Sequence, residues 1–119
     1  MTRALLCEAF GPAETLVVRE VADPVAGPGE VVVDIAAAAL NFFDTLIIEG
    51  KYQYKPELPF SPCGEFSGRV AALGPGATGL SIGERVAGHC YWGAARTRIA
   101  IQAQALVKLP EAISDTAAA

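Results

Sequence analysis

The chain has 119 residues, of which 52% are hydrophobic, and thirteen Asp and Glu outnumber nine Lys and Arg. This size and apolar content predict one folded domain, and they exclude a disordered chain and a complete two-domain enzyme. A net charge of −4, with the basic residues scattered along the sequence, excludes a typical reader of nucleic-acid phosphates.

Hydrophobic runs are short throughout the chain. Polar residues interrupt them at Asp34, Asn41 and Asp44, so none approaches the roughly 20 residues that a membrane-spanning helix needs. At the N-terminus, Glu8 ends a short apolar stretch well before a secretory signal would be complete. We therefore expect a cytoplasmic protein that binds neither membrane nor nucleic acid.

Three cysteines, Cys7, Cys63 and Cys90, lie far apart in the sequence, and His89 is the single histidine. An odd number without a C-x-x-C pair indicates neither a disulfide framework nor a structural zinc site. A metal site built from Cys63, His89 and Cys90 is disfavoured, because adjacent strand residues point to opposite faces. We therefore expect buried or half-buried thiols and no metal.

Most segments alternate apolar and polar residues or form short β-branched runs closed by Gly and Pro. These patterns predict strands at residues 2–9, 16–21, 30–40, 66–73, 85–88, 94–101 and 105–109. Between the second and third strands, residues 23–29 hold two prolines and two glycines, which indicates a turn. Several short strands separated by turns predict a mainly β barrel or sandwich.

Residues 41–50 break this pattern and predict a short helix. Asn41 is a good N-cap residue, Asp44 lies in the first turn, and Gly50 suits the left-handed position after the last turn. Residues 51–62 then predict an irregular loop that carries Tyr52.

The stretch Gly74 to Gly79 matches the dinucleotide-binding pattern G-x-G-x-x-G after a predicted strand. No amphipathic helix follows it, and no acidic residue lies between Glu84 and Glu111 to hold a ribose. We therefore expect a turn between two strands.

At the end of the chain, Ser114 and Asp115 signal the start of a helix, and three alanines follow. Isolated helices need about a dozen residues to be stable, so this start without a helix behind it predicts the N-terminal domain of a longer protein.

Five short stretches recur together in one known family. They are residues 27–33 (GPGEVVV), 40–52 (LNFFDTLIIEGKY), 58–62 (LPFSP), 64–68 (GEFSG) and 83–86 (GERV). With these stretches, the whole chain resembles the N-terminal GroES-like domain of medium-chain dehydrogenases/reductases, in the zinc-independent quinone oxidoreductase branch.

This resemblance implies a mainly β fold, a GroES-like partly open β-barrel with one or two short helices, over residues 1–119. It also implies a nucleotide-binding Rossmann domain after this chain, an active site in the cleft between the two domains, and a full-length homodimer. Zinc-dependent relatives have Cys where Asn41 stands and His where Gly64 stands. The resemblance therefore implies a reaction without a catalytic zinc.

The same resemblance assigns site residues. Asn41 would contact the nicotinamide ribose or the substrate carbonyl, Tyr52 would be a pocket wall and proton donor, and Asp44 would orient both. Phe43 and Trp92 would complete the substrate pocket. Purely structural alternatives are a helix cap for Asn41, a helix-dipole partner for Asp44 and a loop anchor for Tyr52.

The chain also departs from the branch. Cys63 stands where Gly is usual, and Phe43 stands where a small residue or Pro is usual, so the pocket is expected to be narrower. Arg96 and Arg98 fall in a strand that usually buries aromatic residues, which leaves the packing of that strand open. Glu65 is expected to have a structural role, accepting hydrogen bonds near a turn.

We expect the parent protein to transfer hydride from NADPH to a quinone or an α,β-unsaturated carbonyl, and this chain alone to be inactive. The sequence does not distinguish between these acceptors. The choice of NADPH over NADH rests on the resemblance. The alternative is a non-catalytic GroES-like interaction or structural module that binds through its 51–62 loop.

Overall fold

A computed structural model describes residues 1–119, and most of its regular structure is β-strand. The elements are β1 (Thr2–Leu6), η1 (Ala13–Thr15), β2 (Val17–Val21), β3 (Glu30–Ala39), α1 (Phe42–Ile48), β4 (Glu65–Leu73), β5 (Arg85–His89), β6 (Arg98–Gln102), η2 (Ala103–Ala105), β7 (Leu106–Lys108) and α2 (Asp115–Ala118). The predicted mainly β fold with two short helices is confirmed. No helix is long and apolar enough to cross a membrane.

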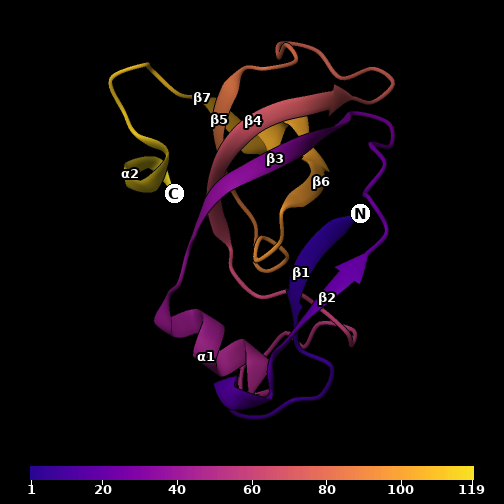
Figure 1. Ribbon diagram of the computed structural model, residues 1–119, viewed down its shortest axis with the longest axis vertical. Coiled ribbons are helices and arrows are strands. Elements are labelled where there is room, and N and C mark those ends of the chain that lie inside the picture. The colour runs from indigo at the N-terminus through magenta and orange to yellow at the C-terminus, as the bar shows by residue number, and fades with distance from the viewer.

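The strands form two antiparallel sheets (Figure 1). A five-stranded sheet has the order β6-β3-β4-β5-β7, and β1 pairs with β2 in a separate two-stranded ribbon. The helix α1 lies at the far end of the molecule from the β4–β5 turn, whereas α2 lies beside the five-stranded sheet. Residues 74–79 belong to the connection between β4 and β5, as predicted, and no helix follows them.

Two predicted strands are shorter than the sequence indicates. The strand predicted at residues 94–101 begins only at Arg98, because the backbone N–H groups of Ala94 and Ala95 donate to Cys63 and Pro62 in a loop. The strand predicted at residues 2–9 ends at Leu6. In both places, contacts with distant loops replace the regular pairing that alternation alone predicts.

The main core lies within the five-stranded sheet. Its centre is a set of valines from β3, β4 and β5 around Phe66, which is fully buried. Burying a Phe side chain stabilises a fold by roughly 2–3 kcal/mol, so this cluster holds the sheet together. The nine buried members are Val31, Val33, Cys63, Phe66, Val70, Val86, Ala94, Ile99 and Leu106.

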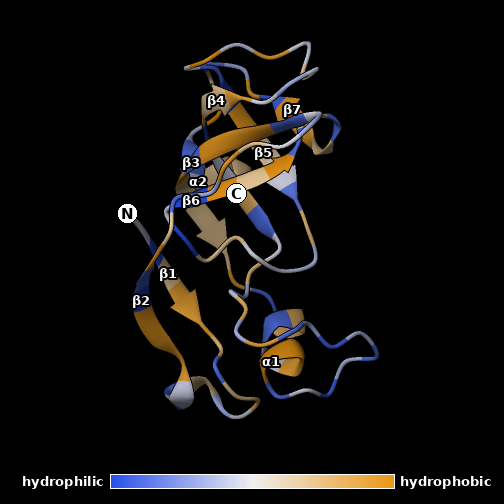
Figure 2. Cartoon of the chain, turned by 90° about the vertical axis from the view of Figure 1, so that its right-hand side faces the viewer, coloured by the Kyte–Doolittle hydropathy of each residue, from blue (hydrophilic) through white to orange (hydrophobic).

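A second, smaller cluster anchors α1. Ile47 and Ile48 from the last turn of the helix pack against Cys7 and Phe60, and the backbones of Cys7 and Phe60 form an isolated bridge. Gly50 ends the helix with φ +71°, as predicted from its position. Figure 2 shows α1 as partly orange (hydrophobic) and partly blue (hydrophilic), in the same half of the molecule as the β1–β2 ribbon. This second cluster fixes the position of the helix that carries the candidate site.

The C-terminal segment is tied to β5 by Arg85. Its guanidinium donates to the Asp115 carboxylate at 3.0 Å and to the Ile113 carbonyl at 2.6 Å. From β4, the hydroxyl of Ser67 donates to the Asp115 carbonyl at 2.6 Å. The Ser114 hydroxyl accepts from the Ala117 N–H, as its predicted N-cap role requires. These contacts hold α2 against the sheet.

Cys63 is the single non-glycine residue with a positive φ, at +74°. Residues with a Cβ pay about 1–2 kcal/mol in this left-handed region, which explains why Gly is usual there in the family that the sequence resembles. The Cys63 N–H donates to the Asp44 carboxylate at 3.0 Å, and the side chain is buried in the main core. These contacts hold the strained backbone in place.

We expect Cys63→Gly to be about 1 kcal/mol more stable than Cys63→Ala, because only glycine adopts a positive φ without steric cost. Urea unfolding of both variants measures the difference. The matched control is Ala94→Gly, at a buried position without a positive φ, which should lose about 1 kcal/mol instead. A Cys63→Gly protein less stable than Cys63→Ala would show that this backbone carries no strain.

Candidate functional site

The register of the sheet brings three polar side chains to one end of adjacent strands. Ala39 pairs with Glu65 across β3 and β4, and Glu65 pairs with His89 across β4 and β5. Asn41 follows two residues after the end of β3, between the strand and α1. Asn41, Glu65 and His89 therefore meet at this end of the sheet, although they are far apart in the sequence.

Asp44 joins the first turn of α1 to the loop before β4. One carboxylate oxygen accepts the backbone N–H of Asn41 at 2.9 Å, and the other accepts that of Cys63 at 3.0 Å. The side chain is buried, and its negative charge lies near the N-terminus of a helix, where it is favoured. Asp44 thus fixes the backbone on both sides of the pocket.

The side chain of Asn41 is oriented by Glu65. Its amide nitrogen donates to a carboxylate oxygen of Glu65 at 3.0 Å. A carboxylate only accepts hydrogen bonds, so this contact determines which end of the Asn41 amide carries the nitrogen. The structural role expected for Glu65 is present, but its partner is a side-chain amide rather than the backbone or an arginine.

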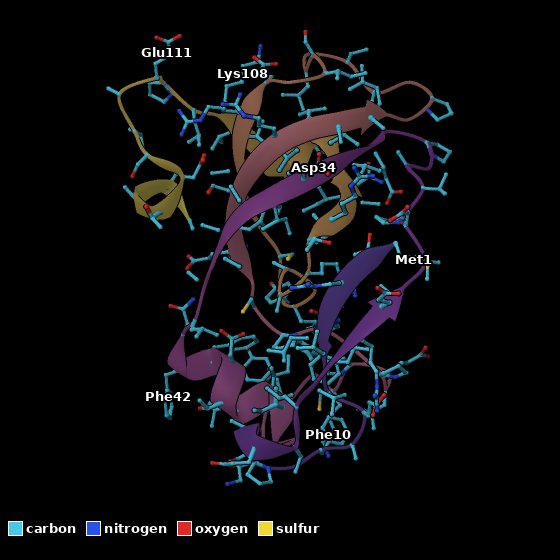
Figure 3. The ribbon with its side chains drawn as sticks, in the orientation of Figure 1. Met1, Phe10, Asp34, Phe42, Lys108 and Glu111 are labelled. Atoms are coloured by element: carbon cyan, nitrogen blue, oxygen red, sulfur yellow. The ribbon has the colours of Figure 1, made fainter.

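Aromatic side chains form one wall of the site. The rings of Phe43 and Tyr52 meet edge to face, with their centroids 4.5 Å apart and an interplanar angle of 77°. This geometry is favourable for two aromatic rings. Phe42, by contrast, is 77% exposed and points away from the body of the molecule (Figure 3).

These residues enclose a pocket of about 250 Å³. Four of the five residues that the sequence assigned to the site line it: Asn41, Phe43, Asp44 and Tyr52. The other lining residues are Gly64, Glu65, His89, Cys90 and Tyr91.

Trp92 lies outside this pocket. It packs against the second hydrophobic cluster and lines a neighbouring groove with Tyr91 and Tyr54. Sequence reasoning missed His89 as a lining residue because only the pairing of β5 with β4 brings it beside Glu65. No local motif signals that pairing. Tyr91, which the sequence offered with Trp92 as a further aromatic wall, does line the pocket.

The two thiols near the pocket are held in their neutral form. Burial, and then the charge of Asp44, raise the pKa of Cys63 to about 11. The same two causes raise the pKa of Cys90 to about 11, partly offset by Arg96. A nucleophilic cysteine needs a lowered pKa, so neither thiol suits covalent catalysis.

The donor set does not suit a metal ion. No group of three or more His, Cys, Asp or Glu side chains is placed to hold one. Gly64, where zinc-dependent relatives have a histidine ligand, leaves no room for a side chain: a Cβ would collide with the carbonyl oxygen of Cys90.

Comparison with known proteins defines the class. The family model of the alcohol dehydrogenase GroES-like domain matches residues 27–111. A quinone oxidoreductase-like protein 2 homolog from Nematostella vectensis is 40% identical over an alignment that covers 98% of this chain and 32% of that protein. The chain therefore belongs to the alcohol dehydrogenase GroES-like domain family, and its architecture is that of the N-terminal domain of a medium-chain dehydrogenase/reductase.

Solved structures agree with this assignment. Human synaptic vesicle membrane protein VAT-1 homolog-like protein has a TM-score of 0.95 at 30% identity, over 99% of this chain and 38% of that one. A Pseudomonas syringae quinone oxidoreductase gives 0.93 at 32% identity, over 99% and 36%. A mycobacterial protein complexed with NADPH gives 0.85 at 31%, over 97% and 34%. The chain spans about a third of the length of the Nematostella relative.

We expect Asp44→Asn to lower the free energy of unfolding by about 2 kcal/mol, because an amide cannot accept both backbone N–H groups. Urea unfolding measures this loss. The control is Asp34→Asn, which breaks an exposed ion pair with Arg98 and should cost less than about 1 kcal/mol. Equal losses in the two variants would contradict the role assigned to Asp44.

The raised thiol pKa values predict a pH-dependent loss of stability. Cys63 and Cys90 keep their protons in the fold up to a pKa of about 11, whereas unfolded thiols lose them near 9.0. The unfolded chain therefore binds fewer protons between these values, so stability should be unaffected below pH 9 and fall as the pH rises toward 11. Urea unfolding at pH 8 to 11 measures the fall, and the Cys63→Ala/Cys90→Ala protein should show less of it. Rapid alkylation of the folded thiols by iodoacetamide at pH 8 would contradict this picture.

Proposed function

We propose that this chain is the substrate-side domain of an NADPH-dependent oxidoreductase that reduces quinones or α,β-unsaturated carbonyls by hydride transfer. The observation that carries the proposal is the pocket in which Asn41 and Tyr52 face a shared space in an oxidoreductase-type domain. The similar proteins include ones named as quinone oxidoreductases, and these names support the choice of acceptor.

The residues that the sequence assigned to the site have distinct tasks in this proposal. The amide of Asn41, held by Glu65, positions the substrate carbonyl or the nicotinamide ribose. Tyr52, packed on Phe43, offers a hydroxyl that donates a proton to the reduced acceptor, and solvent is the other source of that proton. Asp44 touches neither reactant and acts by fixing the backbone. Trp92 would take part only with an acceptor long enough to pass Tyr91.

A bound nicotinamide cofactor supplies the hydride in this chemistry, and the protein supplies position and electrostatics. The NADPH complex of a similar mycobacterial protein supports NADPH as that cofactor. Asn41 is the residue of this chain that would contact the nicotinamide ribose of this cofactor. We place the rest of the cofactor site on a nucleotide-binding domain of the full-length protein. We propose that this full-length protein is a cytoplasmic homodimer.

The proposed reaction needs no zinc. A neutral Asn41 amide stands where zinc-dependent relatives have a thiolate, and the backbone around Gly64 is closed to a histidine side chain. Hydrogen bonds to the acceptor oxygen would replace the metal in stabilising the negative charge that develops there.

The test is NADPH oxidation by the full-length gene product with a panel of quinones and enones. We expect Asn41→Ala to lower kcat/KM about 100-fold, through loss of a hydrogen bond at the reacting oxygen, and Tyr52→Phe to lower it about tenfold. Thr45→Ala, on the exposed side of the same helix, should leave the rate unchanged. Wild-type rates in both site variants would show that the site is wrong. Turnover by the 119-residue chain alone would contradict the assignment as one domain of a larger enzyme.

Glu65 is tested as a positioning residue by comparing two variants of the same enzyme. Glu65→Gln keeps an oxygen that accepts from the Asn41 amide, so it should recover most of the kcat that Glu65→Ala loses. Equal loss in the two variants would mean that the carboxylate does more than orient Asn41.

A further inference from the structure

Two buried polar atoms have no hydrogen-bond partner in the protein: the Ser61 hydroxyl and the Nε of Arg96. Ser61 is only 1% exposed. A buried donor without an acceptor is costly, and native folds keep few of them. Neither residue belongs to the pocket around Asn41.

Ser61 and Arg96 line a second pocket of about 630 Å³, between the loop before β4 and the segment that leads into β6. Phe60, Trp92 and Ile99 give it apolar walls. This volume lies within the range of small-molecule sites, which typically combine apolar walls with a few polar groups.

Arg96 differs sharply from Arg98, its neighbour two positions along. Arg98 forms an ion pair with Asp34 at 2.6 Å (Asp34 is labelled in Figure 3), whereas Arg96 forms no ion pair and its Nε has no hydrogen-bond partner. Burial lowers the pKa of the Arg96 guanidinium, which still carries its charge at neutral pH. Arg96 is therefore a half-buried cation at this pocket that has no ion-pair partner.

The charges around the pocket define the ligand. Arg96 is the one cation that lines it, and Glu57 is the one carboxylate. A dianion such as a phosphate monoester would meet more repulsion from Glu57 than a single carboxylate does. A single carboxylate also matches one guanidinium, which binds it through two parallel hydrogen bonds.

We propose that this second pocket binds a small monocarboxylate with an apolar body, held by Arg96 and Ser61. The apolar body lies against Phe60, Trp92 and Ile99. Rotations of the Ser61 hydroxymethyl group and of the guanidinium bring both buried donors onto the carboxylate, which recovers the hydrogen bonds that they lack. This site is separate from the proposed reaction, so its test requires no enzyme activity.

Trp92 provides the signal, because it is the only tryptophan of the chain and lines the pocket. Titration of the 119-residue chain with octanoate should change its fluorescence saturably, with a Kd of about 1–10 mM as expected for so small a ligand. Octanol, which has the same body without the charge, and inorganic phosphate should each bind at least about tenfold more weakly. Equal binding of octanol, or no saturation with octanoate, would overturn the proposal.

Variants locate the site. Arg96→Gln should weaken octanoate binding at least about tenfold, Arg96→Lys should restore part of it, and Ser61→Ala should weaken it several-fold. The matched control is Arg98→Gln, which removes the same charge two positions away and should bind octanoate as the wild type does. Thermal unfolding confirms that each variant is folded.

Glu57→Gln gives an independent test. Removing the rim carboxylate should tighten octanoate binding about two- to threefold, because it removes a repulsive charge and a competitor for Arg96. Unchanged affinity in Arg96→Gln, or weaker binding in Glu57→Gln, would contradict the site.

Discussion

The Asp44 carboxylate is the contact on which the candidate site depends. It receives one backbone N–H from the start of α1 and another from Cys63, two segments that do not otherwise pair. Because both donors belong to the backbone, the carboxylate fixes the chain itself rather than single side chains. Asn41 on one side and Gly64 on the other are held at the pocket by this one group.

Local signals in the sequence predicted the elements well where local chemistry decides the structure. The helix at α1 followed from the Asn41 cap, the first-turn Asp44 and the closing Gly50, all of which act within a few residues. The strand boundary at Arg98 could not be predicted, because the residues before it bond to a loop more than 30 positions earlier in the chain. Tertiary contacts override propensity there.

The same distinction between local signals and tertiary contacts applies to the residues of the site. Asn41, Phe43, Asp44 and Tyr52 were found because they lie in one short motif of the family. The partners of these residues, Glu65 and His89 among them, come from other strands and are placed by the register. The proposed roles of all these residues stay predictions, and no comparison tests them. Trp92, one residue after Tyr91, lines the neighbouring groove rather than this pocket.

The two separate hydrophobic clusters affect which parts of the fold can unfold locally. The sheet core and the cluster beneath α1 share no buried residue, so each can act as a cooperative unit that opens with its own free energy. Asn41 and Tyr52 stand on the helix side, whereas Glu65 and His89 stand on the sheet side. The pocket thus lies at the boundary between the sheet core and the cluster beneath α1. Local opening of the smaller unit would separate the two walls of the pocket while the five-stranded sheet stays folded. A ligand could then enter and leave without unfolding of the whole domain.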